Sequence, residues 1–351
     1  MIARLLEDKV ELDKDAIDIL YNTGYFGRPR GNVLELSLVE AAYLLYREKI
    51  SITMDSESLS FPEFFKIASM RHRYFELKYI VYKDLKERGF YVQPSVADFR
   101  VYPRGGHPGK TPARSYVYVR SERSSVSITE LMKSLNTVSN VRKQMILAIV
   151  DEESDITFYE VKKISISGQM EQFNDNLNAE SSLLEDRVIV WDKKASSDLY
   201  NKGFYGKPLD EDRLQLSLIE SAYLLEKNLI QIKDRERDKV LDSDYFFNKA
   251  SEIEPEFSIK YHVYRDMREK GLVPKTGFKF GTHFRLYIDI ESPKKIPHSE
   301  YLVHAISENH IFILPIMSRA IRLANSVRKR MVFALNYNGN YEYIDIGRVK
   351  M

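Results

Sequence analysis

The sequence predicts a mixed α/β fold of the α+β type that occurs twice, as a tandem duplication within one chain. The first observation is an internal repeat, in which LYNTGYFGRP at 20–29 returns as LYNKGFYGKP at 199–208, and SNVRKQMILA at 139–148 returns as NSVRKRMVFA at 325–334. The second is that each copy carries helix-type and strand-type hydrophobic patterns in the same order. Because the repeating unit is long and occurs only twice, we expect a duplicated domain pair and not a solenoid.

The repeat divides the chain into four folded parts and a linker. We expect an N-terminal subdomain and a larger C-terminal subdomain in each copy, at 1–70 and 71–166 in copy one and at 188–250 and 251–351 in copy two. The segment SGQMEQFNDNLNAESSLLEDR at 167–187 is polar and weakly patterned, which is typical of a surface linker.

The elements within each copy follow from local patterns. A helix is expected at 37–46, because Leu38, Ala41, Ala42 and Leu45 fall on one face. A longer amphipathic helix in copy two ends near Lys270, before Gly271, a residue suited to the left-handed position that follows a helix.

The rest of copy two reads as strands around one more helix. Strands are expected at 277–288 and 300–306, and a helix at 314–330. The sequence MVFALNYNGNYEYIDI then predicts two strands joined by a turn at Asn338-Gly339.

Composition limits the function classes. The chain has 351 residues, 44% hydrophobic and 30% charged, as in ordinary globular proteins of more than one domain. No apolar run approaches the roughly 18–20 residues of a membrane span, and the start, MIARLLEDKVELDKDA, is too charged for a signal peptide. We therefore expect a cytoplasmic protein without a membrane segment.

Charge and cysteine content narrow the chemistry. The net charge of +2 is too small to predict nucleic-acid binding, because that prediction requires a local basic cluster. The absence of cysteine excludes disulfides, thiolate nucleophiles and cysteine zinc sites. Any catalysis must therefore use Tyr, His, Lys, Ser or carboxylate side chains.

Three residues of copy two could together break a phosphodiester bond. Tyr287 ends an expected strand, His298 lies in a loop beside Pro297, and Lys329 lies near the end of the helix expected at 314–330. One group would take the proton of a ribose 2′-hydroxyl, a second would protonate the departing 5′-oxygen, and a cation would stabilise the phosphorane. From residue type alone, each also fits an ordinary role in packing or on the surface.

The runs KTGFKFGTHFRLY, PHSEYLVH and RLANSVRKRMVFA in copy two resemble the catalytic unit of the archaeal tRNA-intron (splicing) endonucleases, two-repeat homodimeric type. The resemblance implies cleavage of precursor tRNA at a bulge-helix-bulge element, with 2′,3′-cyclic phosphate and 5′-hydroxyl ends and no metal or other cofactor. It implies Tyr287 as general base, His298 as general acid and Lys329 as the stabilising cation. A nuclease-like fold is thereby expected for both C-terminal subdomains.

The resemblance also implies how unpaired RNA is held. Members of the family place a flipped-out bulge base between two arginine planes, and the matching positions are Arg322 and Arg348. Arg322 and Lys329 are seven residues apart, so we expect them on the same face of one helix.

Copy one is expected to be inactive. It keeps Tyr102 and Lys143 but has Ala113 where the general acid should stand, and His107 lies six residues upstream in the loop RGGHPGKTPAR. The basic character of this loop also permits contact with RNA.

A second asymmetry concerns subunit assembly. The turn after Lys143 is acidic, with Asp151, Glu152, Glu153 and Asp155, whereas copy two has the neutral NYNGNY. The resemblance implies that this turn docks into a basic region of a second subunit, which predicts a homodimer.

Two other functions remain open at this level. Asp155 and the segment 160–162 loosely imitate the carboxylate and lysine pattern of a metal-dependent nuclease. A non-catalytic RNA-binding or assembly subunit is the other alternative.

Overall fold

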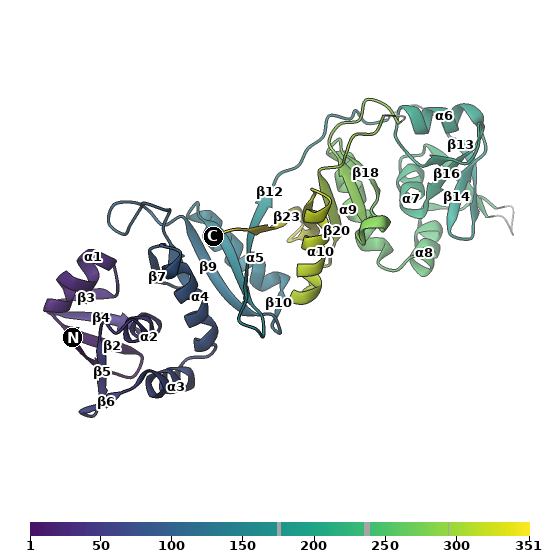
Figure 1. The fold of residues 1–351 in the computed structure, drawn as a ribbon. Helices are drawn as coiled ribbons and strands as arrows, with labels where there is room; N and C mark the ends of the chain where they lie inside the picture. The colour runs from purple at the N-terminus through teal and green to yellow at the C-terminus, as the bar shows by residue number, and fades with distance from the viewer. Residues whose placement is uncertain (174–176, 235–238, 294) are drawn as a thin grey trace. The chain divides into compact units, whose positions relative to one another are not determined.

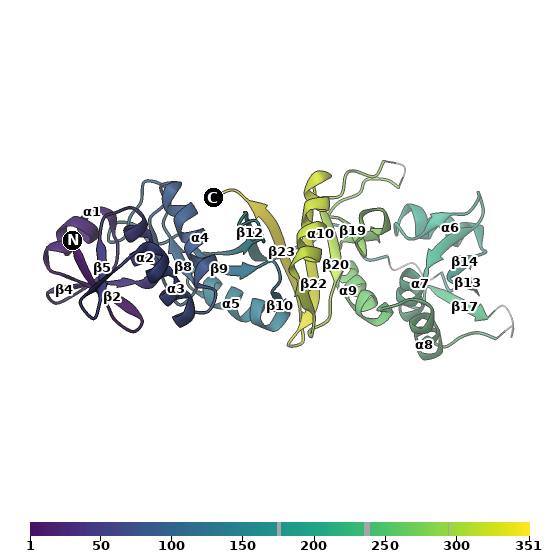
Figure 2. The ribbon, with the colours of Figure 1, turned by 60° about the horizontal axis from the view of Figure 1, so that its bottom comes forward.

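The computed structural model describes residues 1–173, 177–234, 239–293 and 295–351. The chain forms two compact units (Figures 1 and 2). The first unit comprises Met1–Lys162, Ile311–Met317 and Gly347–Met351, and the second comprises Lys163–His310 and Ser318–Ile346. Each unit contains one N-terminal and one C-terminal subdomain, as the repeat predicted, and each is described separately.

The N-terminal subdomain of the first unit is a sheet covered by helices. Its strand order is β3-β4-β2-β1-β5-β6. The strands are β1 (Ile2–Leu5), β2 (Lys9–Asp13), β3 (Arg28–Arg30), β4 (Val33–Ser37), β5 (Ser51–Met54) and β6 (Glu57–Leu59). The helices are a π-helical turn at Ile17–Tyr21, α1 (Asn22–Gly24), α2 (Leu38–Tyr46) and α3 (Phe61–Arg71). Helix α2 confirms the helix expected at 37–46.

The second unit repeats this arrangement, with the strand order β15-β16-β14-β13-β17 among the described residues. The strands are β13 (Ala179–Leu184), β14 (Arg187–Val190), β15 (Lys207–Pro208), β16 (Leu214–Ser217) and β17 (Ile230–Asp234). The helices are α6 (Lys193–Asn201), α7 (Leu218–Glu226) and α8 (Ser243–Ile253).

The linker expected at 167–187 is therefore wrong in its second half. Strand β13 lies inside that range and pairs with both β14 and β17. Upstream of it, the Gly168 amide donates to the Lys270 carbonyl and the Met170 amide to the Gly271 carbonyl, so this stretch is held against the C-terminal subdomain. Residues 174–176 of the expected linker lie outside the described residues.

The C-terminal subdomains share one topology. In the first unit the strand order is β7-β8-β9-β11-β12, and in the second it is β18-β19-β20-β22-β23. The first set is β7 (Val92–Pro94), β8 (Phe99–Val101), β9 (Ser115–Ser121), β11 (Gln144–Val150) and β12 (Ile156–Ile164), with α4 (Phe75–Glu87) and α5 (Ile128–Asn140). The second set is β18 (Val273–Thr276), β19 (Phe284–Tyr287), β20 (Tyr301–Ala305), β22 (Arg330–Tyr337) and β23 (Asn340–Val349), with α9 (Phe257–Glu269) and α10 (Leu314–Ser326). Only the β9–β11 and β20–β22 pairs are parallel in these subdomains as described, so both sheets are mixed.

Two short strands complete the first unit. Strand β10 (Ser125–Ser127) pairs antiparallel with β21 (Ile311–Ile313), which precedes α10 in the sequence. Within the described part of the chain, none of the helices combines the length and apolar character that a membrane span requires.

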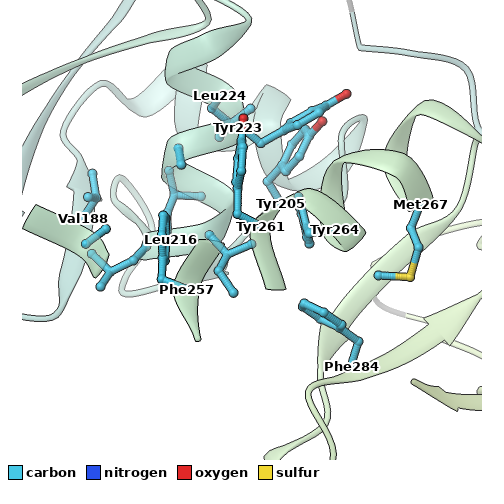
Figure 3. Packing of buried hydrophobic residues seen from close by; sticks show 14 of the residues in the cluster. Val188, Tyr205, Leu216, Tyr223, Leu224, Phe257, Tyr261, Tyr264, Met267 and Phe284 are labelled. Carbon is cyan, nitrogen blue, oxygen red and sulfur yellow. The ribbon is translucent and has the colours of Figure 1, made fainter. Parts of the chain in front are cut away.

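One hydrophobic core joins the two subdomains of each unit. In the second unit it runs from Val188 and Leu216 of the N-terminal sheet, through Phe257 and Tyr264 of α9, to Phe284 of β19 (Figure 3). The corresponding core of the first unit runs from Leu34 through Phe75 and Tyr82 to Phe99. Burial of such aromatic side chains is the main stabilising contribution. It also fixes each small subdomain against the larger one.

Local sequence signals correctly predicted one helix end and one hairpin turn. Helix α9 ends before Gly271, which has φ +71°, and the β22–β23 turn has φ +52° at Asn338 and +81° at Gly339. Two predictions need correction. Residues 277–283 form a short 3₁₀ turn (Phe278–Phe280) and loop between β18 and β19 and are not strand. Helix α10 ends at Ser326, not at 330.

Candidate active site

A pocket of about 490 Å³ in the second unit contains the three residues expected to act in catalysis. Tyr287, His298 and Lys329 all line it, although they come from a strand end, a loop and the segment after a helix. The pocket lies where β18 and β19 meet the N-terminal subdomain, which contributes Tyr200, Phe204, Gly206 and Lys207. Both subdomains of copy two therefore build the site.

Tyr287 is held rigidly at the end of β19. It pairs with Val273 of β18 and is only 5% exposed. Its ring packs in a small apolar cluster with Phe204, Val273 and Ile290, against which Met170 also lies. The phenol therefore reaches the pocket from a fixed apolar support.

His298 is placed by its neighbours in the loop between β19 and β20. Its side chain is exposed, whereas Ser299, the next residue, is only 4% exposed. The Lys329 Nζ donates a hydrogen bond of 2.6 Å to the Ser299 carbonyl oxygen. Lys329 therefore anchors the loop directly beside His298, and the position of His298 depends on this contact.

Lys329 lies beyond α10, so the prediction that it shares a helix face with Arg322 is wrong. The helix ends in a left-handed residue, Arg328 with φ +56°, and the Lys329 amide donates back to the Ala324 carbonyl. This is the hydrogen-bond pattern of a Schellman cap, which turns the chain away from the helix axis. The turn directs Lys329 into the pocket, where it is 9% exposed.

The pocket is strongly cationic. Lys207, Lys275, Arg285 and Lys329 line it, and no carboxylate occurs among its described lining residues. Burial lowers the pKa of Lys329, and the positive charge of Arg285 lowers it further. Such surroundings favour an anionic ligand, and they suit a phosphodiester group.

The pocket also includes residues that the sequence analysis missed. Lys207 belongs to no motif, and Lys275 and Arg285 lie in the run KTGFKFGTHFRLY without an assigned role. The Ser299 hydroxyl is a buried group for which no hydrogen-bond partner occurs among the described residues. The one available signal was the difference between KTGFKFGTH at 275–283 and QPSVAD at 93–98, because this difference removes Lys275 from copy one.

The two arginines expected to hold a bulge base are both exposed and lie outside this pocket. Arg322 is on α10 in the second unit, and Arg348 follows the second-unit part of β23 in the segment assigned to the first unit. Within the first unit, Arg348 lines a hollow of about 620 Å³ together with Asp151 and Asp155 of the acidic turn.

Copy one lacks the same constellation of side chains. Tyr102 is buried and donates from its hydroxyl to Gln93 Oε1 at 2.8 Å. Burial raises the pKa of Tyr102, against the opposing effect of Arg100. Burial therefore favours the neutral form of this phenol, which donates its proton in the hydrogen bond to Gln93.

His107 of copy one is occupied by aromatic contacts. Its ring stacks on Tyr25, with centroids 4.7 Å apart and planes at 18°, and meets Tyr91 edge-on at 6.1 Å. Its Nδ1 also lies 2.9 Å from the Pro108 carbonyl oxygen. These contacts fix the central part of the 104–114 loop against the body of the first unit.

The carboxylates of the acidic turn differ in their partners. Asp151 Oδ1 accepts hydrogen bonds from the amides of Glu153 and Asp155, so this side chain shapes the turn. Glu152 pairs with Arg123 of the same unit. The side chains of Glu153 and Asp155 are exposed.

The pattern at 155–162 that imitates a metal-dependent nuclease is not gathered into a metal site in the described part of the chain. There, no three His, Asp or Glu side chains lie close enough together to hold a metal ion. Glu160 instead accepts a hydrogen bond from Gln144 and pairs with Lys162.

Comparisons with known proteins agree with the duplicated arrangement. A family model described as the tRNA intron endonuclease catalytic C-terminal domain matches residues 75–158 and 257–343. The model of the N-terminal domain of tRNA intron endonuclease matches residues 1–65 and 179–246. Each domain type is thus found twice, in the order of the repeat.

Similar proteins cover the whole chain. A tRNA-splicing endonuclease of Methanococcoides burtonii is 58% identical, over 100% of both chains. One of Methanosarcina mazei is 57% identical over 99% of this chain and 98% of its own. One of Haloferax volcanii is 35% identical over 99% of both. All three organisms are archaea.

Proposed function

This chain belongs to the tRNA intron endonuclease family, and from that premise we propose that it cleaves precursor tRNA at the boundaries between intron and exon. The observation that carries the proposal is the pocket itself, which brings a tyrosine, a histidine and a buried lysine together among further cations. A phosphodiester of RNA supplies both the negative charge that this pocket attracts and the 2′-hydroxyl that the reaction requires.

The proposed reaction needs only side chains of copy two. Tyr287, as phenolate, takes the proton of the 2′-hydroxyl, whose oxygen attacks the adjacent phosphorus. The bond from phosphorus to the 5′-oxygen breaks, and His298 gives that oxygen a proton. Lys329 stabilises the additional negative charge of the phosphorane. The products are a 2′,3′-cyclic phosphate and a 5′-hydroxyl, and no metal ion takes part.

The substrate we propose is a bulge-helix-bulge element, whose unpaired bases can be held outside the stack. Arg322 and Arg348 are both exposed, and a guanidinium plane is suited to stacking on an unpaired base. In the proposed assembly, a homodimer, the two active copies act at the two bulges.

The acidic turn would connect the two subunits. Glu152, Glu153 and Asp155 are all exposed, but Glu152 pairs with Arg123 of the first unit. Glu153 and Asp155 are therefore the part of the turn that we propose to contact the basic region of the partner, and Asp151 maintains its shape.

The decisive experiment is cleavage of an intron-containing precursor tRNA in excess EDTA by the intact chain and by two variants. We expect EDTA-resistant cleavage with cyclic phosphate ends, which His298→Ala reduces by about 10²-fold or more because the 5′-oxygen then departs without a proton donor. His107→Ala is the matched control, since His107 packs against Tyr25 in copy one, and we expect it to cleave as the intact chain does.

The same experiment separates the alternatives. Loss of cleavage in EDTA with recovery in excess Mg²⁺ would indicate a metal-dependent nuclease. Binding of the precursor without cleavage under either condition would indicate an RNA-binding or assembly subunit. Full activity of His298→Ala would show that the assigned site is wrong.

A further inference from the structure

Lys275 and Tyr287 are diagonal neighbours on one face of the sheet. Val273 of β18 lies opposite Tyr287 of β19, and Lys275 lies opposite Arg285. Since alternate residues of a strand point to the same face, Lys275 shares the face of Tyr287. Diagonal pairs are about 7–8 Å apart at the backbone, within reach of a long side chain. Lys275 and Tyr287 both line the catalytic pocket.

Copy one shows that this diagonal pair makes contact. There, Gln93 of β7 lies opposite Arg100 of β8, so Gln93 and Tyr102 occupy the places of Lys275 and Tyr287. The Tyr102 hydroxyl donates to Gln93 Oε1 at 2.8 Å. In copy one the fold therefore brings the end of this side chain to the tyrosine oxygen, and in copy two a lysine occupies the same diagonal position.

Two acceptors of the N-terminal subdomain hold the ammonium group of Lys275. Its Nζ donates to the Gly206 carbonyl oxygen at 3.2 Å and to Glu220 Oε1 at 3.3 Å. Glu220 also accepts hydrogen bonds from the amides of Gly206 and Ser217 and from the Ser217 hydroxyl. An ammonium group has three N–H donors, so these two acceptors leave one for another group.

The support is the same in copy one except for the lysine. Glu40 accepts from the amides of Gly27 and Ser37 and from the Ser37 hydroxyl, in the same pattern as Glu220. Burial raises the pKa of Glu40. Burial would also raise the pKa of Glu220, but Lys275 and the amide donors outweigh it and the net direction is downward. In copy one the charge of Lys86 also acts on Glu40, but it does not outweigh burial. The two copies thus hold the glutamate in the same way, with a hydrogen-bonded lysine, Lys275, only in copy two.

We propose that Lys275 is a positioning residue for the cleavage reaction, which donates its remaining N–H to the oxygen of Tyr287 and stabilises the phenolate that accepts the proton of the 2′-hydroxyl. The inference rests on the proposed function, in which Tyr287 is the base. A cation held beside a phenol favours its ionised form, whereas the neutral Gln93 of copy one accepts a hydrogen bond and favours the neutral form. Copy one has therefore lost the activation of its tyrosine as well as the histidine.

The charge of Glu220 opposes this effect only in part. Glu220 accepts three further hydrogen bonds, and Lys275 is the member of the pair that lines the catalytic pocket, so the pair presents its positive end there. Among the described residues, the basic groups near Lys275 and Tyr287 are Lys207, Arg268, Arg285, His298 and Lys329. Tyr287 and His298 also line a second hollow that contains Asp289, Glu291, Lys295 and Glu300, and the three carboxylates there disfavour a phenolate. Lys275 is the cation that strand register places diagonal to Tyr287, so we expect it to counter these carboxylates.

The test is the pH dependence of single-turnover cleavage for the intact chain, Lys275→Gln and Lys275→Arg. We expect Lys275→Gln to move the rising limb of the profile up by about one pH unit, which lowers the rate at pH 7 about tenfold and leaves the plateau at high pH nearly unchanged. Lys275→Arg should keep the limb close to its original position. Copy one already combines glutamine with the buried glutamate, so Lys275→Gln introduces a pair that this fold accommodates.

Two controls separate this inference from the proposed function. Tyr287→Phe should remove the rising limb, and Gln93→Lys in copy one should leave the profile unchanged. If Tyr287→Phe keeps the limb, the proposed role of the tyrosine is wrong. If Tyr287→Phe removes it and Lys275→Gln lowers the rate equally at every pH, the inference about Lys275 is overturned while the proposed function stands.

Discussion

The C-terminal subdomains of copy one and copy two have the same strand order and the same backbone signals but differ around one tyrosine. Arg142 and Arg328 both adopt left-handed conformations, with φ +54° and +56°, before Lys143 and Lys329. Tyr102 and Tyr287 are both buried beside the same strand pair. Copy one then lacks the histidine and the lysine that surround Tyr287, at Ala113 and Gln93.

The comparison shows that fold and chemistry depend on different residues. The helix cap at Ser37 and Glu40, and its repeat at Ser217 and Glu220, fixes the N-terminal subdomain in both copies. Replacement of pocket side chains leaves these contacts intact, so an inactive copy can remain fully folded. Copy one is thus a natural control for substitutions made in copy two.

The largest difference between the copies should appear in cleavage, when the corresponding lysines Lys329 and Lys143 are replaced. Lys329→Met removes both a cation of the pocket and the 2.6 Å hydrogen bond to the Ser299 carbonyl that anchors the loop of His298. We expect single-turnover cleavage to fall about 10²- to 10³-fold, the usual effect of removing a group that stabilises developing charge. Lys143→Met is the matched change in copy one and should cleave at the original rate. Equal losses in both variants would show that the lysines have a common structural role.

Sequence patterns predicted the local elements because their causes are local. Gly271 ends α9 and Asn338-Gly339 turns the β22–β23 hairpin through backbone conformations that these residue types favour. The end of α10 was missed because the left-handed residue there is Arg328, which carries no such signal. Strand β13 was missed because its sequence, AESSLL, is polar and its pairing with β17 joins residues about fifty positions apart.

The site could be predicted only in part. Residue types alone left Tyr287, His298 and Lys329 open to ordinary roles, and the family resemblance selected them. Lys275 begins one of the runs that carry the resemblance, but its role could not be predicted, because its partners Gly206 and Glu220 lie in the other subdomain and are brought to it only by the fold. Long-range pairing of charged residues leaves no periodic pattern in a sequence.

The turns after β11 and β22 offer a second comparison, which concerns assembly. We expect the double change Glu153→Gln and Asp155→Asn to weaken the homodimer about tenfold, because it removes the two exposed charges of the turn that form no ion pair among the described residues and leaves the shaping role of Asp151 intact. Sedimentation velocity over a range of concentrations would measure this. Glu152→Gln is the control, since Glu152 is paired with Arg123 in its own unit. A monomeric intact chain, or an unchanged dissociation constant in the double variant, would contradict the docking role.

The smallest difference between the copies should appear in stability, at the two buried glutamates, Glu220 and Glu40. Their contributions to the free energy of unfolding should change with pH in opposite directions. The pKa of Glu220 lies below the usual 4.5, so its charge stabilises the fold above that pH, and this contribution is lost as the pH falls through the folded value. The pKa of Glu40 lies above 4.5, so ionisation of Glu40 opposes folding, and this opposition grows as the pH rises from 4.5 toward the folded value.

Glutamine loses the same cap contacts in both copies, because its amide nitrogen cannot accept a hydrogen bond, so the difference in trend with pH reports on the charge. We expect Glu220→Gln to cost about 1–2 kcal/mol of unfolding free energy at pH 7 and less at pH 4, because the stabilising contribution of the Glu220 charge already declines below pH 4.5. Glu40→Gln should cost less at pH 7 than at pH 4. Chemical unfolding at both pH values would test this, with the single tryptophan, Trp191, reporting on the second unit and circular dichroism on the whole chain. Parallel trends in the two variants would mean that Lys275 does not alter the titration of the buried glutamate. The difference in activity between the copies would then depend on the histidine alone.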